Sequence, residues 1–233
     1  MTVSRPSSLI FVSLLILVIS ANAYAGGRPD GQSRSWFGQV NTGYEFTTGS
    51  TRDFLHANWA LGGGALYWPS DWPLGIALDL NYSRFDFTSS TIRAINDAIA
   101  DDPMNEGEIT GGNVENWQFG LNGIWSLGDD TGSGFYLKGG VSWNSITGRL
   151  TDTGLVYYPP ICDPWFWWCT PGGIGPGTIV VGKQSSDEFG WNVGIGYSVR
   201  NLSGQLYFEL GYEQIQFDNT DIEYIPFNIG YRW

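Results

Sequence analysis

The chain has 233 residues, including 33 Gly, 12 Trp, 12 Tyr and 13 Phe, and only 15% of its residues are charged. This composition is typical of β structure and argues against a helical protein. The net charge of −12 argues against a nucleic-acid-binding protein, because phosphates are bound by Lys and Arg.

The N-terminal residues have the pattern of an export signal. Arg5 precedes an apolar run at 9–19 that is too short to span a bilayer as a helix, and Ala23-Tyr24-Ala25 fits a signal-peptidase site. Cleavage after Ala25 is expected, with Ala23 as the alternative. The predicted organisation is a signal peptide at 1–25, an N-terminal segment at 26–34 and one domain at 35–233.

From residue 35 onward, apolar residues alternate with small or polar ones, as in strands whose two faces meet different environments. Each segment is long enough to cross a membrane as a tilted strand of about 9–11 residues. The eight segments lie at 36–46, 55–67, 74–82, 117–127, 135–143, 189–197, 206–212 and 225–233. The predicted fold class is all-β, an eight-stranded antiparallel up-and-down transmembrane β-barrel.

The connections differ in length between the two ends of this barrel. Those at 68–73, 128–134 and 200–204 are short, whereas those at 88–113 and 146–188 are long. In membrane barrels short turns face the periplasm and longer loops face outward. Aromatic residues near the short turns predict an interfacial girdle, and they are Trp36, Tyr67, Trp68, Trp72, Trp125, Phe135, Tyr197, Tyr231 and Trp233.

Periodicity alone does not say which face is outside, so a soluble barrel with an apolar interior is the alternative. The polar faces carry glycine and neutral amides rather than the Lys and Glu of a water-exposed wall. Together with the unequal turn lengths, this favours the membrane barrel.

The chain resembles the eight-stranded outer-membrane β-barrel superfamily of OmpA, OmpX, OmpW and opacity-type proteins. Segments 190–197 and 228–233 carry the resemblance. It implies the outer membrane of a Gram-negative bacterium, with segment 26–34 in the periplasm, and contact with outer-membrane lipids and lipopolysaccharide. It also implies insertion by the barrel-assembly machinery, with Tyr231 and Trp233 as the assembly signal.

Six charged side chains project inward according to the alternation, namely Glu45, Asp79, Lys138, Glu209, Glu213 and Arg232. Side chains fill the lumen of such a narrow barrel, and buried charges are tolerated when they pair. Asp79, Lys138 and Glu209 are at similar heights, so we predict a Lys138-centred ion-pair network that plugs the lumen. The alternative is a gate for small solutes.

The single histidine, His56, is predicted on the inward face near the outer rim, on a strand that begins at Leu55. Lipid A-modifying barrels place a His with Ser and an acid at such a rim, for acyl transfer. Here Asn58 occupies the position of the Ser, which favours a structural histidine. No enzymatic activity and no cofactor are predicted.

The longest loop contains Cys162 and Cys169. Exported proteins meet an oxidising compartment, so a disulfide is expected, and two cysteines without a histidine partner make a poor zinc site. The enclosed aromatic residues are Trp165, Phe166, Trp167 and Trp168. They predict a surface that binds an extracellular ligand, or alternatively a cover over the barrel mouth or an insertion into the outer leaflet.

The other long loop contains Ile92, Ile95 and Ile99 at helical spacing, with Ser90 as the predicted N-cap. This pattern predicts a short surface helix. The predicted function is a structural or surface-interaction scaffold that acts through loops 88–113 and 146–188. The alternatives are a narrow channel for small or hydrophobic solutes and a lipid A-modifying enzyme.

Overall fold

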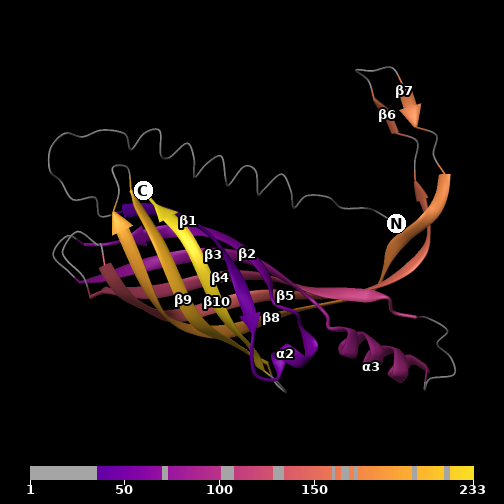
Figure 1. Ribbon diagram of the computed structural model, residues 1–233, viewed down its shortest axis with the longest axis horizontal. Coiled ribbons are helices and arrows are strands. Elements are labelled where there is room, and N and C mark those ends of the chain that lie inside the picture. The colour runs from indigo at the N-terminus through magenta and orange to yellow at the C-terminus, as the bar shows by residue number, and fades with distance from the viewer. Residues whose placement is uncertain are drawn as a thin grey trace.

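The computed structural model describes residues 36–69, 73–100, 108–127, 134–158, 161–163, 168–170, 173–200, 204–217 and 221–233. Eight strands form a closed antiparallel barrel, ordered β1-β10-β9-β8-β5-β4-β3-β2 (Figure 1). Their bounds are β1 Trp36–Thr47, β2 Asn58–Tyr67, β3 Leu74–Asp86, β4 Gly111–Ser126, β5 Gly134–Tyr158, β8 Gly173–Arg200, β9 Gln205–Gln216 and β10 Asp221–Arg232. The predicted fold class is therefore confirmed.

The outside of the barrel is apolar, as a lipid-facing wall requires. Leu78, Leu121 and Val193 lie in the middle of their strands and are 41%, 47% and 51% exposed. Exposed aromatic residues flank this band at both ends, and they include Trp36, Trp125, Phe135 and Tyr197 at the short-turn end and Phe46, Trp59, Trp143 and Phe189 at the other. An apolar band between aromatic girdles matches membrane barrels and not the soluble alternative.

The girdle prediction was wrong for Trp68. This side chain is partly buried and packs against residues inside the barrel at the short-turn end, including Leu66. Trp68 follows the last residue of β2, Tyr67, so the strand alternation no longer determines the direction of its side chain. Trp72 lies outside the described residues.

The two ends of the barrel differ as the sequence predicts. The chain joins β2 to β3, β4 to β5 and β8 to β9 by short connections at the end where β10 finishes. The opposite end, which we call the outer end, carries helices α2 (Thr51–Phe54) and α3 (Ser89–Ala100) (Figure 1). None of the helices described is both long and apolar enough to cross a membrane.

Segment 146–188, predicted as the longest loop, is largely strand. Strand β4 pairs with β5 as far as Thr151, and β5 and β8 stay paired beyond that point, from Thr151 opposite Val180 to Tyr158 opposite Gly173, just past a register shift at Leu150/Thr151. This outer hairpin projects away from the barrel (Figure 1). Its chain is rich in β-branched residues, which suit an extended strand even where no lipid-facing alternation is present. At its far end β6 (Ile161–Asp163) pairs with β7 (Trp168–Thr170).

The predicted surface helix is confirmed, but its cap is Thr88 rather than Ser90. The Thr88 hydroxyl oxygen accepts a hydrogen bond of 3.2 Å from the Thr91 backbone N–H. Further along, the Asn96 side chain donates to the Ile109 carbonyl and accepts from the Ile109 N–H, at 2.8 and 2.7 Å. This clamp holds the returning chain against α3.

Candidate functional site

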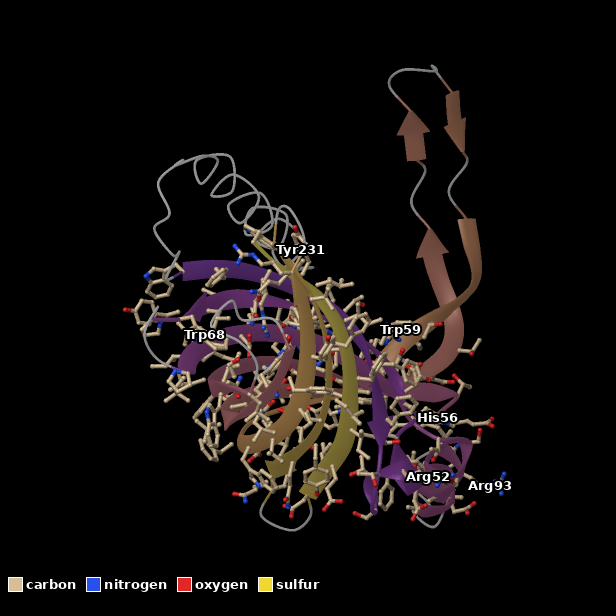
Figure 2. All side chains as sticks on the ribbon, turned by 60° about the vertical axis from the view of Figure 1, so that its left-hand side comes forward. Arg52, His56, Trp59, Trp68, Arg93 and Tyr231 are labelled. Carbon is tan, nitrogen blue, oxygen red and sulfur yellow. The ribbon has the colours of Figure 1, made fainter. Side chains whose placement is uncertain are left out.

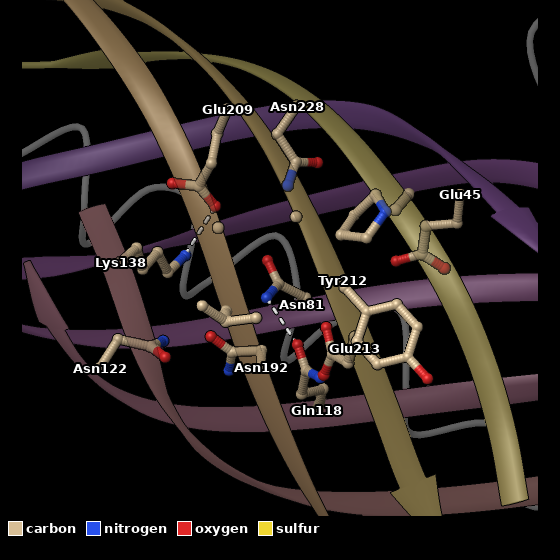
Figure 3. Close-up of a pocket in the computed structure, with 15 residues that line it drawn as sticks. Glu45, Asn81, Gln118, Asn122, Lys138, Asn192, Glu209, Tyr212, Glu213 and Asn228 are labelled. Atoms are coloured by element: carbon tan, nitrogen blue, oxygen red, sulfur yellow. Dashed lines mark hydrogen bonds and ion pairs between the residues drawn. The ribbon is translucent and has the colours of Figure 1, made fainter. Parts of the chain in front are cut away.

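Charged residues from three strands meet in the middle of the lumen. Lys138 on β5 places its Nζ atom 3.0 Å from a Glu209 carboxylate oxygen on β9 (Figure 3). The same atom is 3.2 Å from an Asp79 carboxylate oxygen on β3. All three side chains are almost entirely removed from solvent. The structure thus brings together the three residues selected from the sequence.

A wider polar network surrounds this ion-pair cluster. Asp79 accepts hydrogen bonds from the side-chain amides of Asn122, at 2.7 Å, and Gln39. Gln39 in turn accepts a 3.0 Å hydrogen bond from the Arg232 guanidinium. The Gln39 side-chain amide therefore links the ion-pair cluster to Arg232 at the end of β10. Sequence alternation placed Arg232 inside but could not identify its partners, which depend on register between strands.

Arg232 lies between two aromatic rings that sequence reasoning did not single out. Its guanidinium carbon is 4.1 Å from the Tyr207 ring centroid and 5.0 Å from that of Tyr136. Each ring covers a glycine directly opposite on the next strand, with Tyr136 over Gly196 and Tyr207 over Gly230. A side chain at either glycine would collide with the ring. A tyrosine that packs over a glycine of the next strand can be recognised only when the register between the two strands is known, because the two residues are far apart in the sequence.

The outer half of the lumen contains a second polar group of residues. Gln118 on β4 donates to Glu213 on β9, and its carbonyl oxygen accepts a 2.9 Å hydrogen bond from Asn81. Glu213 also accepts from the Ser142 hydroxyl at 3.4 Å. Glu45 on β1 faces the same region and is only 6% exposed. The sequence placed both carboxylates inside but predicted no role for them.

Apolar clusters occupy both ends of the lumen. The outer-end cluster consists of Leu55, Phe85, Val114, Ile146, Ile215 and Tyr224. The short-turn cluster consists of Leu66, Ala77, Ile124, Tyr136 and Tyr207. The cavity between them measures ≈ 30 Å³, enough for about two waters. The lumen is thus largely filled by side chains, with polar layers enclosed between apolar ones.

A second cavity lies outside the barrel wall at its outer end, and we call it the outer groove. It measures ≈ 450 Å³ and is lined by Phe87 and Ile92 from the α3 region, Asn113 on β4, and Thr151 and Thr178 from the hairpin. Arg84 and Asp86 also line it and form an exposed ion pair of 3.5 Å. Asn113 is 8% exposed, and its side-chain oxygen has no hydrogen-bond partner among the residues that the structure describes. Sequence reasoning missed this site because three separate segments build it.

Comparison with known proteins identifies the family. The model of the outer membrane protein beta-barrel domain family matches residues 11–233. The chain belongs to this family. Its wall therefore faces the lipids of an outer membrane, and its short-turn end faces the periplasm.

Solved structures of outer-membrane barrels are similar in fold. Ail of Yersinia pestis, solved with the heparin analogue sucrose octasulfate, has 10% identity and a TM-score of 0.48, covering 86% of this chain and all of that one. A major outer membrane protein of Thermus thermophilus has 14% identity, a TM-score of 0.48 and the same coverage. Neisserial surface protein A has 13% identity and a TM-score of 0.44, covering 85% and 96%. No curated protein matches.

The structure contradicts the predicted position of His56. This residue is exposed and precedes β2, which begins at Asn58, and its backbone N–H donates to the Asp86 carbonyl at 2.8 Å (Figure 2). Leu55 is the buried residue instead, in an isolated bridge with Phe87. Helix α2 interrupts the alternation, which therefore cannot be extended back from β2. Within the described part of the chain, no three His, Cys, Asp or Glu residues gather to hold a metal ion.

The remaining predicted sites are described in part. Cys162 and Cys169 stand directly opposite each other across the β6–β7 pair, and antiparallel neighbours have Cα separations that a disulfide can bridge. The disulfide itself stays a prediction, since the side chains of Cys162, Cys169 and Trp168 are not described and Trp165, Phe166 and Trp167 lie outside the described residues.

The predicted assembly signal lies at the seam between the first and last strands. The rings of Tyr231 and Trp233 stack with centroids 6.3 Å apart. The Trp233 backbone N–H donates to the Gly38 carbonyl at 3.0 Å, which extends the β1–β10 pairing by one residue.

Proposed function

We propose that this protein is a non-conducting outer-membrane scaffold that binds an extracellular ligand at its outer end. The observation that carries the proposal is the outer groove, because the α3 region and the outer hairpin meet there. The groove measures ≈ 450 Å³, and the buried Asn113 oxygen in its lining has no partner within the described ranges, which is the size and chemistry of a ligand site.

The chemistry of the groove suits a saccharide. Phe87 and Ile92 offer apolar surface for a sugar ring, while Thr110, Thr151 and Thr178 offer hydroxyl groups. The Asn113 oxygen would accept a hydrogen bond from a sugar hydroxyl, which would satisfy a group that is costly to leave unpaired. Two sources can supply such a saccharide, namely lipopolysaccharide molecules beside the barrel and the glycans of another cell.

A binding screen tests the proposal. The mature barrel in lipid nanodiscs is exposed to immobilised glycans, including lipopolysaccharide core saccharides. Binding should fall about tenfold or more in Asn113→Ala and Ile92→Glu, and should persist in Asp97→Ala, which alters an exposed α3 residue outside the groove lining. Equal binding by all four proteins would refute the assignment of the groove.

The channel alternative is tested by single-channel recording in planar bilayers. The filled lumen and its two apolar clusters support a silent barrel. Wild type, whose folding is verified by its heat-dependent gel migration, should therefore show no steady openings. Steady openings that change when Lys138 is replaced would identify a gated channel instead.

Insertion by the barrel-assembly machinery through Tyr231 and Trp233 is also proposed, as is a disulfide between Cys162 and Cys169. The position of Tyr231 and Trp233 at the closing seam, with their half-buried rings stacked at the end of β10, supports the first. Replacing both aromatic residues by Ala should reduce the amount of folded barrel in the outer membrane without preventing refolding of the purified chain.

A further inference from the structure

The buried charges of the lumen do not balance. Four carboxylates are buried there, namely Glu45, Asp79, Glu209 and Glu213, against the two cationic side chains Lys138 and Arg232. Lys138 pairs with Asp79 and Glu209. Among the described residues, neither Glu45 nor Glu213 has a Lys or Arg within ion-pair distance.

The two unbalanced carboxylates face one another across β10. Glu45 on β1 is opposite Pro226 of β10, and Glu213 on β9 is opposite Tyr224 of β10. Pro226 and Tyr224 are two residues apart on that strand. Both side chains point into the barrel and line the same ≈ 30 Å³ cavity (Figure 3). Each is buried, at 6% exposure.

Amide oxygen atoms complete the surroundings of this cavity. Asn81, Gln118, Asn122 and Asn228 line it, from β3, β4 and β10. Of the residues that line it, Glu45 and Asn122 each carry a buried side-chain oxygen, Oε2 and Oδ1, with no hydrogen-bond partner in the described part of the chain. A buried acceptor without a partner is destabilising, and a buried carboxylate without a counter-charge is more so. Glu45 and Glu213 therefore have no counter-charge of their own among the described residues.

We propose that the lumen binds one calcium ion between Glu45 and Glu213. Two carboxylates balance a divalent charge, and calcium accepts six to eight oxygen ligands in flexible geometry, including carboxylates, amide carbonyls and water. Magnesium requires near-ideal octahedral geometry, which mixed donors from several strands do not favour. Lys138 also lines the cavity, but its charge is already opposed by Asp79 and Glu209.

The position of the site implies slow exchange. The outer-end cluster and the short-turn cluster close the lumen on either side of the cavity. An ion that enters while the barrel closes is then retained after folding, which distinguishes this site from weak cation binding at an acidic surface.

The test is to refold the mature chain in lipid with calcium, remove free ions with a chelator, and measure bound metal by elemental mass spectrometry. We expect about one retained calcium per folded chain, and faster unfolding in urea when refolding takes place in a chelator instead. The double variant Glu45→Gln/Glu213→Gln should retain none and unfold at the same rate in both conditions. Asp97→Asn, at an exposed carboxylate of α3, should behave as wild type.

Two outcomes would overturn the proposal. Absence of retained calcium in wild type, with identical unfolding in calcium and chelator, would mean that the two carboxyl groups hold a proton instead. Retention of magnesium but not calcium would refute the metal assignment. If the double variant does not fold, Glu45→Gln alone serves, together with terbium luminescence sensitised by the tryptophans, which should fall in that variant.

Discussion

Lys138 is the residue that neutralises the middle of the lumen, and its removal tests how much the ion-pair cluster contributes. Lys138→Met would leave Asp79 and Glu209 buried without a shared cation. Breaking one side of a buried pair costs about 3–5 kcal/mol of unfolding free energy. Urea unfolding in lipid vesicles measures the loss. The triple variant with Asp79→Asn and Glu209→Gln should recover much of it, whereas equal stability of Lys138→Met and wild type would contradict the role as a structural plug.

Gly196 provides a second test on a single residue. A methyl group there would overlap the Tyr136 ring, which is packed against Arg232 and cannot withdraw into open space. Gly196→Ala should therefore destabilise the barrel by about 1–3 kcal/mol, the usual effect of overpacking. Gly139→Ala is the matched control on the neighbouring strand, since its new methyl group would be no closer than 3.6 Å to another atom. Similar unfolding midpoints for the two variants would contradict this packing.

Among the elements, α3 is tied to the chain that enters β4 by the Asn96 side chain, which can be removed without touching the wall. Asn96→Ala deletes both hydrogen bonds to the Ile109 backbone. Each such bond contributes about 0.5–1.5 kcal/mol, so local opening of this segment should become about tenfold or more frequent. Hydrogen exchange at the Ile109 amide measures it. Asp97→Ala is the control, and unchanged exchange in Asn96→Ala would show that α3 is held by other contacts.

The molecule as a whole should fold without its outer hairpin. Strand β4 pairs with β5 only as far as Thr151, and β9 pairs with β8 only from Phe189 onward. Joining Leu150 to Gly182 by Asn-Gly should give a folded barrel within about 1 kcal/mol of wild type, because loop shortening changes closure entropy little. Heat-dependent gel migration and urea unfolding measure this. A shortened chain that remains unfolded would make the hairpin part of the folding unit.

For the molecule as a whole, the sequence predicts the barrel well and the helices and hairpin at its outer end less well. Alternation in segments such as 74–82 is local, and an up-and-down order follows from chain order, so strands and inward-facing charges could be predicted. The hairpin lacks a lipid-facing alternation. Helix α2 breaks the alternation before Asn58, so the predicted start of the strand at Leu55 and the predicted inward direction of His56 were wrong. The pairing of Tyr136 with Gly196 and the outer groove depend on contacts between distant segments, which no local pattern encodes.

The unbroken passage of β5 and β8 from the barrel wall into the outer hairpin has a mechanical consequence. A load applied at the far end of the hairpin would pull both strands along their own axes, parallel to the wall. The ladders to β4 and β9 would then be sheared, so many hydrogen bonds would resist together instead of opening one after another. The hairpin and the wall therefore form one continuous pair of strands, and a load on the hairpin would be carried by both ladders together.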